Sequence, residues 1–69
     1  MTIDEAIRHC REMALSNAAS GVAYRKGGQT ILAESCEECA AEHEQLAAWL
    51  EELQQKRAEI DTLRRAGKR

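Results

Sequence analysis

The sequence predicts an all-α fold: an antiparallel hairpin of two helices, with a long second helix, that oligomerises into a helical bundle. The 69-residue chain has no proline and few β-branched residues, a composition that favours helix over sheet. In two long segments, apolar residues recur at alternating intervals of three and four, as along one face of a helix. A glycine-containing stretch separates these segments, so residues 1–69 are expected to form a single helical-hairpin domain.

The first helix is expected at about 3–19. Thr2 and Glu5 form a capping box, in which the threonine hydroxyl accepts from the amide of Glu5 and the glutamate carboxylate accepts from the amide of Thr2. One apolar stripe follows, formed by Ile3, Ile7, Cys10 and Ala14, with Asn17 next in the series. Gly21 favours a left-handed cap, so the helix is expected to end before it.

Residues 20–30 are expected to form a loop, because the pair Gly27 and Gly28 favours a turn. Two cations and two glycines before a helix start are also features that bind a phosphate group. The candidate ligand-binding residues are Tyr24, Arg25, Lys26, Gln29 and Thr30. A solvated connecting loop is the alternative interpretation of this segment.

The second helix is expected at about 31–65 and has two alternative starts. Thr30 can cap a helix that begins at Ile31, while Ser35 and Glu38 form a second capping box. A regular heptad seam follows, made of Leu32, Cys36, Cys39, His43, Leu46, Leu50, Leu53, Arg57 and Ile60. Gly67 is expected to end the helix.

The unequal helix lengths predict a surface for self-association. A first helix of roughly 17 residues, at a rise of about 1.5 Å per residue, covers the second only to Ala47 or Ala48. The apolar residues left in water are Trp49, Leu50, Leu53, Ile60 and Leu63, and together with Leu46 beside them they are the predicted oligomer interface. Exposed apolar patches usually have partners, so the chain is expected to bind copies of itself.

A zinc site is the alternative interpretation of four residues, Cys10, Cys36, Cys39 and His43. In the hairpin, Cys10 is expected near residue 40, where thiols and imidazole would converge. Residues 36 and 43 nevertheless lie about 10.5 Å apart along a straight helix, which strains a single metal centre. Cysteine also packs as a small hydrophobic residue. We therefore expect seam packing, with no metal and no cofactor.

Catalysis and membrane insertion are not expected. No nucleophile, base and orienting group come together in a cleft, so the chain is predicted not to be an enzyme. No apolar run is long enough to span a membrane. Three cysteines cannot all pair within one chain, and no export signal is visible, so a cytoplasmic location is expected.

Charge is unevenly distributed along the chain. Residues 1–52 contain ten acids and four bases, whereas residues 53–69 contain two acids and six bases. A basic C-terminal tail of this kind can contact nucleic acid, so a nucleic-acid-binding regulator is one functional alternative. Cations also stabilise the C-terminal end of a helix, which explains the same residues without any nucleic acid.

Two segments resemble a known group of proteins. Residues 1–10, with the pattern AI-x-HC, and residues 38–53, with the pattern CA-x-EH-x-QLA-x-WL-x-EL, are similar to short uncharacterised helical proteins encoded by phages and prophages of gut bacteria. The loop at 21–30 lies outside the resemblance. The resemblance implies a non-enzymatic viral binding protein in the host bacterial cytosol.

The same resemblance implies an anti-defence role, which serves immune evasion. Some oligomeric helical hairpins sequester a nucleotide-type immune signal between subunits, which is the function that we expect here. The alternative is an inhibitor that docks on a host defence protein, as anti-CRISPR proteins do, with Trp49 as an anchor.

Overall fold

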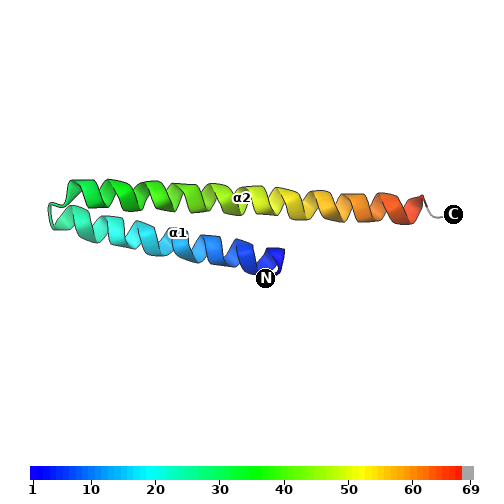
Figure 1. Ribbon diagram of the computed structural model, residues 1–69, viewed down its shortest axis with the longest axis horizontal. Helices are drawn as coiled ribbons and strands as arrows, with labels where there is room; N and C mark the ends of the chain where they lie inside the picture. Colours follow the sequence, from blue (N-terminus) through cyan, green and yellow to red (C-terminus); the bar gives the residue numbers. More distant parts are fainter. Residues whose placement is uncertain (68–69) are drawn as a thin grey trace.

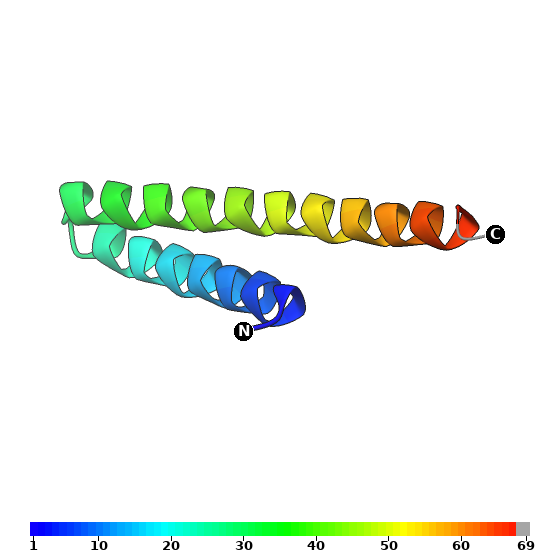
Figure 2. The same cartoon turned by 45° about the vertical axis from the view of Figure 1, so that its right-hand side comes forward.

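The computed structural model describes residues 1–67 and consists of two helices packed side by side as an antiparallel hairpin (Figures 1 and 2). Helix α1 spans Ile3–Lys26 and helix α2 spans Thr30–Ala66. No strand occurs within residues 1–67. The predicted all-α fold with a longer second helix is therefore confirmed, while its assembly into a bundle stays a prediction.

The hairpin is a rod two helices thick. Its principal dimensions are 65 × 16 × 12 Å, and its Cα radius of gyration is 17.6 Å. The C-terminal end of α2 projects beyond the N-terminus of α1 (Figure 1). Every residue of the rod is therefore close to its surface, and the core is limited to the line where the helices meet.

Helix α1 begins as predicted and ends later than predicted. The Thr2 hydroxyl accepts from the amide of Glu5 (3.1 Å), and it also lies 3.2 Å from the Glu5 carboxylate, to which it donates. The helix then continues through Gly21 to Lys26, so the expected end at about 19 was wrong. Gly21 is buried against α2 and serves close helix packing there, where we had expected it to form a cap.

The expected loop at 20–30 reduces to a turn of three residues, 27–29. Gly28 has φ of +77°, a left-handed conformation that glycine adopts without steric cost. The amide of Gln29 donates to the Tyr24 carbonyl (2.9 Å), which closes the end of α1. Helix α2 starts at Thr30 with Gln29 as its N-cap, so the earlier of the two alternative starts is the observed one.

Small side chains form the seam between the helices. The buried or half-buried seam residues of α1 are Ile3, Ile7, Cys10, Ala14, Asn17 and Gly21. Those of α2 are Ala33, Cys36, Ala40, His43, Ala47, Leu50 and Gln54. The predicted stripe of α1 is therefore at the interface. Of the predicted seam of α2, only Cys36, His43 and Leu50 occupy this face.

The two edges of the seam differ in chemistry. Glu37 and Glu51 of α2 pair with Arg25 and Arg11 of α1, and Gln54 donates to Asp4 (2.5 Å). These residues form the polar edge. One residue turns a helix by about 100°, so the residues that directly precede the seam positions lie on the other edge of the seam from those that directly follow them. On α2 this second edge carries the large apolar side chains.

Candidate functional site

The exposed apolar side chains of α2 follow one helical line. Leu32, Cys39, Leu46, Leu53 and Ile60 recur every seven residues, and Trp49 and Leu63 each follow one of them by three. We call these seven residues the α2 stripe. Its six large members are between 43% and 71% exposed, and Cys39 is half-buried. The line therefore has the spacing of a second heptad seam, with no partner helix in the hairpin.

The seam and the α2 stripe differ in the size of their side chains. Ala33 and Ala47 are buried against α1, while their sequence neighbours Leu32 and Leu46 lie in the exposed stripe. The buried apolar residues within 1–67 are Ile7, Ala14, Ala33 and Ala47. Three of these four buried residues are alanines, whereas Leu32, Leu46 and Leu53 of α2 are exposed.

Five of the six predicted interface residues are exposed on the stripe: Leu46, Trp49, Leu53, Ile60 and Leu63. The sixth, Leu50, is half-buried at the seam. The expected reason for the exposure was wrong. Residues at the start of α1, such as Asp4, line grooves with Gln54 and Ala58, well past residue 48. Trp49, Leu53 and Ile60 are exposed because they lie off the seam. Asp61 still lines a groove with the start of α1, and Leu63 lies beyond it.

The predicted ligand-binding residues lie around the turn. Tyr24, Arg25 and Lys26 form the last turn of α1, and Gln29 and Thr30 lead into α2. The structure brings these residues to one end of the rod, although three of them are helical where a loop was expected.

Arg25 is held by a carboxylate at this end. Its Nε lies 2.5 Å from Oε1 of Glu37 and its Nη2 lies 2.8 Å from Oε2, a two-point ion pair between half-exposed side chains. This hydrogen bond raises the pKa of Arg25, and the charges of Glu37 and Glu34 raise it further. It also lowers the pKa of Glu37. A carboxylate thus occupies the position that a phosphate would need, which spacing alone could not reveal.

The cysteines do not converge as expected. The contacts of Asp4 with Gln54, and of Gly21 with Cys36, place Cys10 level with residue 47 and not with residue 40. The expectation was wrong because the chain reverses at Gly28, later than the centre of the predicted loop. Cys10 is therefore displaced along the rod from Cys36 by about 16 Å.

The other candidate zinc ligands pack within the hairpin. His43 Nδ1–H donates to the Cys39 carbonyl at 2.7 Å, a bond within the same helix. Within residues 1–67, no three His, Cys, Asp or Glu side chains are arranged to hold a metal ion. Cys10, Cys36 and Cys39 are half-buried free thiols, of which Cys10 and Cys36 lie in the seam.

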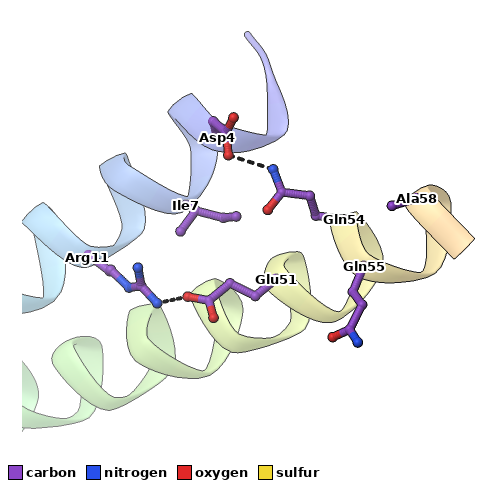
Figure 3. A pocket seen from close by; sticks show the side chains of 7 residues that line it. All are labelled: Asp4, Ile7, Arg11, Glu51, Gln54, Gln55 and Ala58. Carbon is purple, nitrogen blue, oxygen red and sulfur yellow. Dashed lines mark hydrogen bonds and ion pairs between the residues drawn. The ribbon is translucent and has the colours of Figure 1, made fainter.

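A polar groove lies at the open end of the hairpin (Figure 3). Its lining residues are Asp4, Ile7, Arg11, Glu51, Gln54, Gln55 and Ala58. Arg11 points to Glu51 and Gln54 to Asp4 across the groove, with Ile7 between the two contacts (Figure 3). The polar groups of the groove are therefore used to hold the start of α1 on α2.

Comparison of this chain with protein-family models, with curated proteins and with solved structures gives no match. Neither of the two described helices has an apolar stretch long enough to cross a membrane.

Proposed function

We propose that this chain is a non-enzymatic helical binding protein that works as a homo-oligomer, with the α2 stripe as the surface that joins the copies. One observation carries the proposal: six large apolar side chains of α2 lie exposed on the stripe, while the buried apolar residues of α2 in the seam are Ala33 and Ala47. A contiguous exposed apolar surface of this kind usually marks a protein–protein interface.

The energetics of burial support self-association. Full burial of a leucine or isoleucine side chain contributes about 1.5–3 kcal/mol. Within residues 1–67, the one buried residue of these two types is Ile7, which is 7% exposed. The six large residues of the stripe are each about half exposed, so covering them contributes on the order of 5–9 kcal/mol per copy. That gain equals the total stability of many small domains, about 5–15 kcal/mol.

In the phage setting that the sequence resemblance implies, we propose an anti-defence role in the bacterial cytosol. A second candidate is an inhibitor that docks through the same stripe on a host defence protein. Trp49 favours this candidate, because it is 58% exposed and tryptophan is a frequent anchor at interfaces. Sequestration of a nucleotide-type signal has less support, because Glu37 engages Arg25.

Nucleic-acid binding through the basic tail is also weakly supported. Arg64 and Arg65 lie in the last turn of α2, where cations stabilise the negative end of the helix dipole. Lys68 and Arg69 lie outside the described residues.

Sedimentation equilibrium over a concentration series tests the proposal. The wild type is expected to have a mass that is a multiple of 7.7 kDa. Replacing Leu46 and Leu53 together by serine is expected to give the monomer. Leu15→Ser is the matched control, because Leu15 is an exposed leucine on α1 outside the stripe, and it should keep the wild-type mass. A wild type that stays monomeric throughout contradicts the proposal.

Thermal-shift titration separates the candidate ligands. Cyclic di- and trinucleotides are expected to leave the Tm unchanged at millimolar concentration, because Arg25 is already paired. A rise in Tm that is lost in Lys26→Ala would instead favour nucleotide sequestration at the turn.

A further inference from the structure

We propose that two copies associate through the α2 stripe with their α2 helices antiparallel, and that the two hairpins form a four-helix bundle centred on Trp49. The inference rests on the proposed function, because it takes the stripe as the surface that joins copies. It adds the number of copies, their relative direction and the residue at the two-fold axis.

The charge distribution of α2 favours the antiparallel direction. Residues 30–52 carry seven acids and no lysine or arginine: Glu34, Glu37, Glu38, Glu42, Glu44, Glu51 and Glu52. Residues 53–66 carry four bases and two acids: Lys56, Arg57, Arg64 and Arg65, with Glu59 and Asp61. Parallel helices would place the two acidic halves together, whereas antiparallel helices place each acidic half beside a basic half.

Two charged residues in line with the α2 stripe fix the centre of the dimer. Glu42 and Lys56 lie on the same helical line as Trp49, seven residues before it and seven residues after it. A two-fold axis at Trp49 therefore brings Glu42 of one copy level with Lys56 of the second copy, and symmetry makes this contact twice. A parallel dimer in register would instead oppose Glu42 to Glu42 and Lys56 to Lys56.

The length of α2 agrees with the same centre. The midpoint of Thr30–Ala66 is residue 48, so an axis at Trp49 gives nearly complete overlap of the two α2 helices. Ile60 and Leu63 then lie level with residues 38 and 35 of the second copy, between its Leu32 and Cys39. The part of α2 that projects beyond α1 is thereby covered by the other hairpin.

Helix α1 also offers an apolar edge to the bundle. Ala6, Met13 and Ser20 directly precede the seam residues Ile7, Ala14 and Gly21, and they therefore lie on the edge opposite the ion pairs. Met13 remains 37% exposed there. This edge adjoins the stripe, so the two α1 helices can close the bundle.

A charge-reversal cycle at Glu42 and Lys56 tests the antiparallel direction of the two α2 helices, with the dimer Kd measured by sedimentation equilibrium. Both positions are exposed, and the contact that Lys56→Glu removes within the hairpin is the exposed ion pair with Glu59 (3.4 Å), so the hairpin tolerates either change. In the antiparallel dimer, Glu42→Lys and Lys56→Glu each create two like-charge contacts and are expected to raise the dimer Kd about tenfold. The double variant restores both pairs and should return the Kd to within about twofold of the wild type.

Other outcomes of the cycle overturn different claims. Single variants with an unchanged Kd overturn the antiparallel direction, because a parallel dimer has like-charge contacts before and after each change. A trimer or larger wild-type assembly overturns the four-helix bundle and leaves the proposed function standing. A wild type that is monomeric at every concentration overturns both.

Disulfide trapping gives a second, independent measurement. In a chain whose three native cysteines are replaced by alanine, Glu42→Cys and Lys56→Cys chains are mixed under mild oxidation. The antiparallel dimer is expected to give mainly the mixed disulfide between the two variants. Efficient bonds between two Glu42→Cys chains and between two Lys56→Cys chains would overturn the direction. Glu44→Cys, off the stripe, is the control for random collision.

Discussion

At Gly21 the backbone of α1 lies against α2 with no side chain between them. A Cβ atom there would lie 3.3 Å from Cγ of Glu37 and 3.6 Å from Cβ of Cys36, so one methyl group fits after a small shift of the flexible Glu37. Gly21→Ala is expected to stabilise the hairpin by about 0.5 kcal/mol, because glycine is unfavourable within a helix. Gly21→Leu should destabilise it by about 1–3 kcal/mol. If urea titration showed that Gly21→Leu is more stable than Gly21→Ala, this close approach would be contradicted.

The pair of Arg25 and Glu37 predicts a stability change in acid. The pKa of Glu37 is lowered below 4.5 by the hydrogen bond from Arg25, so the pair contributes above pH 4.5 and its contribution is lost as the pH falls through the lowered pKa. Glu37→Gln should therefore lower the Tm at neutral pH, and its difference from the wild type should shrink in acid. Glu38→Gln, at an exposed neighbouring position, is the control. A pH-independent difference would contradict an ionic origin.

Two neighbouring alanines of α2 test the assignment of its faces. Ala47 is 1% exposed in the seam, whereas Ala48 is exposed to water. Ala47→Leu is expected to destabilise the hairpin by about 1–3 kcal/mol, because the added side chain has no space between the helices. Ala48→Leu, the same chemical change one residue later, should alter the stability by less than about 0.5 kcal/mol. Equal effects in thermal unfolding would show that the faces are assigned wrongly.

The sequence predicts where α1 begins better than it predicts how α1 and α2 pack against each other. The capping box at Thr2 marks the start of α1, and its stripe of Ile7, Cys10 and Ala14 marks the buried face. Gly21 was misinterpreted because a glycine that caps a helix and one that admits a neighbouring helix have the same local pattern. Only the residues across the seam distinguish the two roles.

The faces of α2 were ambiguous for a related reason. Two heptad lines run along this helix one residue apart, one through Ala33 and Ala47 and one through Leu32 and Leu46. Periodicity detects both lines and does not say which one meets α1. The interface residues were predicted from the unequal lengths of the helices, whereas Leu46, Trp49 and Leu53 are exposed because they lie off the seam. The contact of Arg25 with Glu37 depends on the turn position, so it was not foreseen.

The whole molecule is far more extended than its length requires. A compact domain of this size has a radius of gyration of about 11 Å, whereas the hairpin has 17.6 Å. An antiparallel dimer centred on Trp49 doubles the mass and adds thickness with little change in length. Small-angle X-ray scattering should therefore give a particle close to 65 Å long at twice the monomer mass. A markedly longer particle would indicate end-to-end association.

The position of the single tryptophan has a further, optical consequence. Trp49 is the one indole in the chain, and it is 58% exposed in the lone hairpin. Association at the stripe moves this indole from water into an apolar contact, where its fluorescence shifts to shorter wavelength. Trp49 is therefore an intrinsic fluorescence reporter of association at the α2 stripe. Dilution should return the emission to longer wavelength, so the assembly can be followed without any label.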